Sequence, residues 1–128
     1  MVVNQGNIHW MRRDEAGGSA IIHPYVVVQE NVLNHSRIQT VVVCALTSNL
    51  KRAKAPGNVL LEAGEANLPN QSVVEVSKIS TVDKAQLGEP SGSLSEERIK
   101  QILAGMQFLQ LMTERRGTGE QSSGTSRL

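Results

Sequence analysis

Aromatic residues are scarce in this chain of 128 residues, which has one tryptophan, one tyrosine and one phenylalanine. Proteins that hold single-stranded nucleic acid by stacking its bases normally carry more rings than Trp10, Tyr25 and Phe108 provide. The chain also lacks a large excess of charge of either sign, because the formal net charge is +1 and the isoelectric point is near 8.0. A domain that binds nucleic acid through charge alone is more basic. Any such function here must therefore rest on local charge, hydrogen bonds and a groove between two copies.

Cysteine is almost absent, since Cys44 is the only one. It cannot form an internal disulfide, and its apolar surroundings predict a reduced, buried thiol in a cytoplasmic protein. One cysteine and three scattered histidines argue against a structural zinc site, so we expect neither metal nor cofactor. No run approaches the roughly 18 apolar residues of a membrane span. The N-terminus lacks a basic segment followed by an apolar stretch, so we expect no secretory signal.

What the sequence does contain is a series of short apolar segments. Strands are expected over residues 8–11, 21–29, 39–46, 58–62 and 72–79. The unbroken apolar run of 39–46 predicts burial on both faces, and Pro24 is expected near a strand start or at an edge. The intervening segments are rich in turn residues or charge, and 91–93 is expected to end a linker. These patterns predict a small antiparallel barrel or curled sheet.

One helix is expected at the C-terminal end. Ser93 and Glu96 have the spacing of a capping box, and apolar residues follow at helical spacing: Ile99, Ile102, Leu103, Met106 and Leu109. Gly117 is a natural stop. Because residues 117–128 show no apolar periodicity, we expect a disordered tail there and a single domain over 1–116. The predicted class is mainly β, or α+β.

Three segments together resemble one family: HPYVVVQENVLN, VVVCALTSN and PGNVLLEAGEANLPNQSVVEVSKISTVDKAQL. Over residues 6 to about 112 the chain resembles MazF/PemK/Kid-type toxins, the ribonuclease half of toxin–antitoxin pairs. The resemblance implies an SH3-like antiparallel barrel of the CcdB/Kid/MazF type that pairs as a homodimer. It also implies metal-independent cleavage of single-stranded RNA and a cognate antitoxin that blocks the RNA groove. CcdB, a gyrase poison, shares the fold, so the fold alone does not establish the reaction.

The resemblance also places candidate site residues. RNA cleavage through the ribose 2′-hydroxyl needs a base, an acid and donors for the charge that develops on the phosphate. His23 stands where the family carries an arginine before the proline of its second strand, and Thr47 matches the family's threonine at the end of its third. We expect His23 and Thr47 to be catalytic. Ser48 is expected to donate a hydrogen bond to the RNA.

The basic residues form two further groups in expected loops. Arg12 and Arg13 follow the first expected strand, and Lys51 and Arg52 follow the third, with Lys54 nearby. Because phosphate contacts supply much of the affinity for nucleic acid, we expect Arg12, Arg13, Lys51 and Arg52 to bind RNA. The competing interpretation is a solvated charged face.

The sequence departs from the family pattern at several positions. His23 replaces an arginine, and a histidine lacks the permanent, bidentate charge of arginine. Ser80 replaces the arginine of an Ile-Arg-Thr-x-Asp motif, and Glu75 stands where some members carry arginine. The first loop is also shorter by about two residues, and Glu15 does not match the position of the family's loop glutamate.

Two hypotheses follow from these departures. In the first, catalysis survives: histidine is a competent acid or base, His9 and His23 divide the work, and Arg12 and Arg13 supply the missing charge. In the second, the protein is a degenerate binding module that recognises an antitoxin-like or other protein partner without cleaving RNA. Packing of His9 inside a strand and solvation of His35 in a loop are the simpler interpretations of those two rings.

Overall fold

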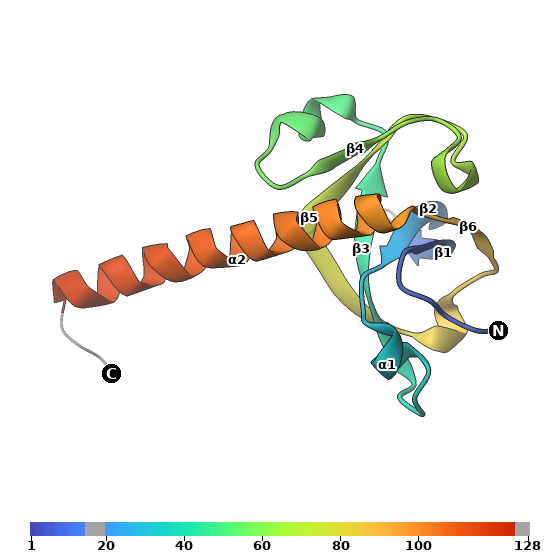
Figure 1. Ribbon diagram of the computed structural model, residues 1–128, viewed down its shortest axis with the longest axis horizontal. Coiled ribbons are helices and arrows are strands. Elements are labelled where there is room, and N and C mark those ends of the chain that lie inside the picture. The colour runs from blue at the N-terminus through green and yellow to red at the C-terminus, as the bar shows by residue number, and fades with distance from the viewer. Residues whose placement is uncertain (15–19, 125–128) are drawn as a thin grey trace.

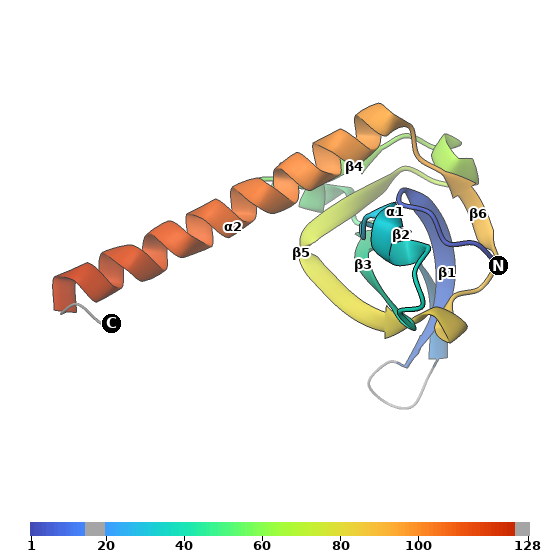
Figure 2. The same ribbon diagram turned by 60° about the horizontal axis from the view of Figure 1, so that its bottom comes forward.

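Six antiparallel strands form one curled sheet in the computed structural model (Figure 1). The structure describes residues 1–14 and 20–124, with side chains over 1–12 and 21–113. The strands are β1 (Asn7–Asp14), β2 (Ala20–Val27), β3 (Thr40–Thr47), β4 (Val59–Leu61), β5 (Ser72–Asp83) and β6 (Pro90–Ser93), arranged in the order β4-β5-β3-β2-β1-β6. Figure 2 shows the sheet wrapping into a half-barrel. The predicted mainly β fold with a C-terminal helix is therefore confirmed.

Helical segments are short except at the C-terminus. α1 (Asn31–Asn34) precedes β3, and three 3-10 turns lie between later strands: η1 (Leu50–Lys54), η2 (Glu65–Asn67) and η3 (Lys84–Gln86). The long helix α2 (Glu96–Gly124) contacts β5 and β4 and then extends beyond the sheet (Figure 1). No helix among the described residues is both long and apolar enough to cross a membrane.

Two hydrophobic clusters pack on the two faces of the sheet, because successive side chains of a strand point to opposite faces. The first cluster includes Val26, Cys44 and Leu46 together with Ile102 of α2. The second, which we call the second-cluster face, includes Tyr25, Val27, Val43, Ala45 and Leu87. β3 contributes to both clusters, which confirms the burial expected from its unbroken apolar run.

Several elements differ from the sequence-based expectation. β1 continues to Asp14 and β2 begins at Ala20, so residues 12–14 and 20, which lie outside the expected strands 8–11 and 21–29, belong to strands. Glu15 lies outside the described residues. β5 continues to Asp83. The expected linker that ends at 91–93 is instead strand β6, paired with β1. A short segment containing proline and glycine has little intrinsic strand preference, and it is tolerated here because it lies at the sheet edge.

The start of α2 also corrects a prediction. Ser93 is the last residue of β6, and its hydroxyl donates to Asn7 Oδ1 at 2.7 Å instead of capping the helix. Ser95 caps it, because its Oγ accepts a hydrogen bond from the Arg98 N–H at 3.2 Å. α2 also continues past Gly117, where a stop was expected, to Gly124. Residues 125–128 of the expected tail lie outside the described part, and disorder over 117–128 stays a prediction.

Candidate active site

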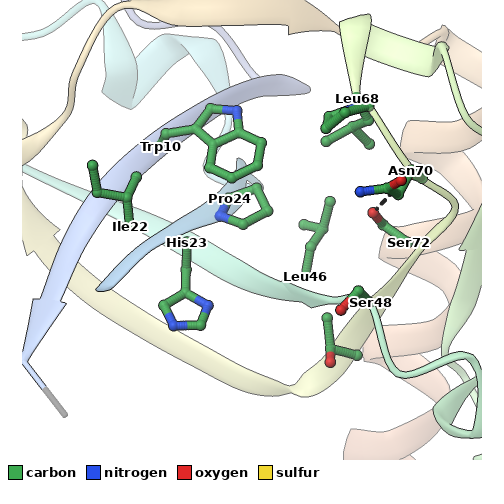
Figure 3. Close-up of a pocket in the computed structure, with 11 residues that line it drawn as sticks. Trp10, Ile22, His23, Pro24, Leu46, Ser48, Leu68, Asn70 and Ser72 are labelled. Atoms are coloured by element: carbon green, nitrogen blue, oxygen red, sulfur yellow. Dashed lines mark hydrogen bonds between the residues drawn. The ribbon is translucent and has the colours of Figure 1, made fainter. Parts of the chain in front are cut away.

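A cavity of about 240 Å³ opens where β2 and β3 separate (Figure 3). The β2–β3 ladder pairs Val27 with Val43 and Tyr25 with Ala45, and on the side of the cavity it ends at Tyr25 and Ala45. Pro24, the next residue of β2, has no backbone N–H with which to continue a ladder. The residues that line the cavity come from both strands and from neighbouring segments: Trp10, Ile22, His23, Pro24, Leu46, Thr47, Ser48, Leu68, Pro69, Asn70 and Ser72.

Strand register brings His23 and Thr47 to the same part of the sheet. The last pair of the β2–β3 ladder on this side joins Tyr25 to Ala45, and His23 and Thr47 each lie two residues beyond it, where the strands separate. Because the side-chain period of a strand is two, both belong to the second-cluster face. In Figure 3 His23 projects to the other side of β2 from Pro24, as this alternation requires. Both side chains are partly exposed at the cavity.

Thr47 and the two residues after it form the expected strand-ending turn. The Thr47 hydroxyl accepts a hydrogen bond from the Asn49 N–H at 3.2 Å. The Asn49 side chain in turn accepts from the Lys51 N–H, also at 3.2 Å, and so caps η1. A hydroxyl that accepts one hydrogen bond keeps its own proton available for donation. Thr47 is therefore oriented by the backbone and can still donate to a ligand in the cavity.

The other two histidines have structural partners elsewhere. His9 is fully buried, with Nδ1 2.6 Å from the carbonyl oxygen of Gly88. Its Nε2 is buried and has no hydrogen-bond partner within the described part of the chain. The ring has no route to a substrate, which supports the packing interpretation and argues against acid–base work shared with His23. His35 Nε2 lies 2.8 Å from Asn4 Oδ1 at an exposed site.

The residues expected to bind RNA lie at several separate parts of the surface. Ser48 lines the cavity, whereas Lys51 is exposed on η1. Arg52 Nε lies 3.9 Å from Glu75 Oε2 and lines a separate cavity of about 470 Å³ beside α2. Arg12 lines a third cavity, of about 540 Å³, on the second-cluster face. The side chain of Arg13 lies outside the described residues.

Cys44 is buried, and its surroundings leave its thiol unreactive. Cys44 Sγ donates to the Glu75 carbonyl oxygen at 2.8 Å. Burial first, and then the nearby Glu75 charge, raises the pKa of the Cys44 thiol to about 12. A thiol in this state is not a nucleophile at neutral pH. Among the described residues, no group of three or more histidines, cysteines and carboxylates is placed to hold a metal ion.

Sequence reasoning overlooked Trp10, Asn70 and Ser72 as members of the site. Trp10 pairs with Pro24 across β1 and β2, so its ring and the proline ring face the same cavity. Because aromatic residues are scarce, Trp10 was not considered as a site residue. Its place in a strand next to the one that carries His23 was the available signal. Asn70 and Ser72 come from the segment that enters β5, with the Ser72 hydroxyl donating to the Asn70 carbonyl at 3.1 Å. Only the tertiary fold brings that segment to β2 and β3.

Comparison with known proteins gives consistent results. A family profile described as "PemK-like, MazF-like toxin of type II toxin-antitoxin system" matches residues 4–109. Endoribonuclease MazF6 of Mycobacterium tuberculosis is 34% identical over 108 residues, which cover 83% of this chain and 95% of the relative. The MazE–MazF structure from Deinococcus radiodurans superposes with a TM-score of 0.71 at 18% identity, covering 88% of this chain and 98% of that one. An endoribonuclease of a mycobacterial species in complex with its cognate antitoxin gives a TM-score of 0.65 at 21% identity, covering 81% and 90%.

Proposed function

This chain belongs to the PemK-like, MazF-like toxin family of type II toxin–antitoxin systems, and we propose that it is an endoribonuclease toxin that cleaves single-stranded mRNA at short sequence motifs without a metal ion. The single observation that carries the proposal is that His23, within β2, and Thr47 and Ser48, at the end of β3, line one cavity. The family relationship supplies the reaction type. The cavity lining offers an imidazole and hydroxyl groups as candidates for that chemistry.

In the proposed reaction the 2′-oxygen of one nucleotide forms a bond to the adjacent phosphorus, and the bond from phosphorus to the 5′-oxygen breaks. A base removes the 2′-hydroxyl proton, and an acid protonates the leaving 5′-oxygen. The products are a 2′,3′-cyclic phosphate and a 5′-hydroxyl. His23 takes part in the proton transfer, because an imidazole can both accept and donate a proton near neutral pH.

Thr47 and Ser48 act on the phosphate. The negative charge on the phosphate oxygens is redistributed as the new bond forms, and fixed hydrogen-bond donors stabilise it. The Thr47 hydroxyl accepts the Asn49 N–H, and its own proton is available for donation to a phosphate oxygen. Ser48 is exposed at the same rim and adds a second hydroxyl.

The test is cleavage of a mixed-sequence RNA by the purified protein in EDTA, with the ends of the fragments mapped. Specific fragments ending in 2′,3′-cyclic phosphates are expected, and a 2′-deoxy substitution at the mapped site should prevent cleavage there. His23→Ala should lose most activity, whereas His35→Ala, at an exposed histidine bonded to Asn4, should not. Cleavage unchanged in His23→Ala would remove this histidine from the reaction.

A second function is favoured by the two departures at His23 and Ser80, which stand where the family carries arginines. Ser80 lines the third cavity on the same face as His23, so both departures fall near the site. The alternative is a binding module that recognises an antitoxin-like or other protein without cleaving RNA. Growth arrest on expression with no RNA fragments, and no cleavage by the purified wild type, would support this alternative over the endoribonuclease.

The proposed partners are a cognate antitoxin and a second copy of the chain, acting in the cytoplasm where mRNA is translated. The apolar residues Phe108, Leu111 and Met112 of α2 are 46%, 54% and 41% exposed. Phe108 and Met112 also line the 470 Å³ cavity beside β5. Exposed apolar groups in such number on one helix mark an interaction surface. Light scattering should give the mass of a dimer, and co-expression with the antitoxin should restore growth.

A further inference from the structure

We propose that Lys78 of β5 is a further phosphate-contacting residue of this site, a role that rests on the proposed ribonuclease function. Lys78 lines the 540 Å³ cavity on the second-cluster face together with Arg12, Tyr25 and Ser80. No acidic residue is found among the described residues that line this cavity. Two cations at one cavity, whose lining also contains apolar residues, form the local positive charge that an RNA backbone requires.

Strand register sets Lys78 next to the catalytic candidates. The β3–β5 ladder pairs Val43 with Ser80 and Cys44 with Ile79, and the register then shifts; Lys78 and Ala45 are the residues that follow this last pair on the two strands. Ala45 pairs with Tyr25 on the other side. His23 and Thr47 lie two residues beyond that pair on the same face, a step of about 7 Å along the strands. The long lysine side chain spans such a distance, so its ammonium group and the Thr47 hydroxyl can contact one RNA strand together.

The ion pair with Glu75 leaves part of the Lys78 ammonium group accessible to another ligand. Lys78 Nζ lies 3.5 Å from Glu75 Oε1, and the Glu75 side chain is only 7% exposed. Arg52 lies on the other oxygen of the same carboxylate, at 3.9 Å. One buried carboxylate thus faces two cations, which leaves one positive charge in excess, and the Lys78 side chain is 51% exposed. Glu75 positions the ammonium group while solvent, or a phosphate, occupies its other side.

The position of Ser80 suggests that Lys78 supplies the positive charge that Ser80 does not. By the resemblance described above, Ser80 takes the place of an arginine in the family motif, and Lys78 lies two residues before it on the same strand. Residues two apart on a strand point to the same face, and both line the same cavity. A cation is therefore present at Lys78, the preceding residue on the same face of β5 as Ser80.

The experiment compares Lys78→Gln, Lys78→Arg and the double variant Lys78→Gln/Ser80→Arg with the wild type. Cleavage of mixed-sequence RNA is measured, and binding of an uncleavable single-stranded DNA oligonucleotide is followed by anisotropy at several salt concentrations. Lys78→Gln should lower the cleavage rate about tenfold or more and reduce the slope of log affinity against log salt by about 0.7. Lys78→Arg and the double variant should recover both. Lys100→Gln, at an exposed lysine on α2, is the matched control and should change neither.

Two outcomes would overturn the role of Lys78. In the first, Lys78→Gln has the same salt slope and the same cleavage rate as the wild type. In the second, Lys78→Arg loses as much cleavage rate and salt slope as Lys78→Gln. The second result would mean that the side chain acts only in packing. Failure of the proposed function has a separate signature, because the wild type itself would then produce no RNA fragments. The salt slope would still report on Lys78 in that case.

Discussion

Arg98 of α2 holds Glu65 of η2 in a two-point ion pair, with Nε 2.9 Å from Oε1 and Nη2 2.8 Å from Oε2. Both side chains are 25% exposed. Glu65 Oε2 also accepts the Glu62 N–H at 2.7 Å, so the same carboxylate organises the turn after β4. The pair fastens the first turns of the C-terminal helix to the loop that leads to Asn70 and Ser72 in the candidate active site.

Replacing Glu65 by Gln should therefore reduce the free energy of unfolding by about 1 kcal/mol at pH 7. The hydrogen bond from Arg98 is the main cause that lowers the pKa of Glu65 below the ordinary value of 4.5. A carboxyl with a lowered folded-state pKa stabilises the fold fully above the unfolded value and loses that contribution as the pH falls. Urea unfolding from pH 7 down to pH 3 should show the wild-type advantage shrinking below about pH 4.5. A difference that is constant over that range would contradict this assignment.

A substitution at Gly105 should destabilise the protein although it lies in a helix. Gly57, at φ +86°, and Gly105 are in backbone contact, and a Cβ at Gly105 would overlap the Gly57 carbonyl oxygen. Glycine to alanine in an open helix stabilises by about 1 kcal/mol, whereas overpacking costs about 1–3 kcal/mol. Gly105→Ala should therefore lower the urea midpoint. The adjacent Ala104→Gly, at an exposed position, should cost only the helix-propensity difference, and a more stable Gly105→Ala would show that α2 can shift away.

Removing the Thr47 hydroxyl should slow RNA cleavage without unfolding the protein. Thr47→Val keeps the branched shape but loses the donor, and the loss of one such donor in a catalytic site typically costs about 10²–10³ in rate. Thr47→Ser should retain most activity because it keeps the hydroxyl. Thr40→Val, at the other end of β3, is the control on the same strand. Equal rates for Thr47→Val and Thr47→Ser would exclude the proposed role of the hydroxyl.

Trp10 should report on ligand binding through its fluorescence. It is the only tryptophan in the chain, it is partly exposed, and it lines the candidate cavity opposite Pro24. Binding of a single-stranded oligonucleotide there changes the solvation of the indole ring and permits base stacking. Titration should give a saturable change in emission with the same midpoint as anisotropy. Unchanged emission at saturation by anisotropy would place the ligand elsewhere on the surface.

Apolar periodicity predicted most of the sheet but missed the elements that tertiary pairing creates. The run at 39–46 predicted a strand buried on both faces, and β3 has that burial, because hydrophobic pattern dominates where burial is complete. Pro90–Ser93 has no such pattern, and its strand conformation comes from pairing with β1. The helix cap shifted from Ser93 to Ser95 for the same reason, since Ser93 is engaged in that edge strand by its bond to Asn7.

The sequence by itself determined the family, the mainly β class and the candidates His23, Thr47 and Ser48, because strand-end motifs and apolar periodicity are local properties of the chain. Only the tertiary structure decided which residues share a surface with them. Trp10 and Asn70 reach the cavity through sheet curvature, and Lys78 reaches the second-cluster face through the β3–β5 register. Burial likewise distinguishes His9 from His23, although both histidines lie within expected strands. Register and burial depend on contacts between distant segments, and no local pattern encodes them.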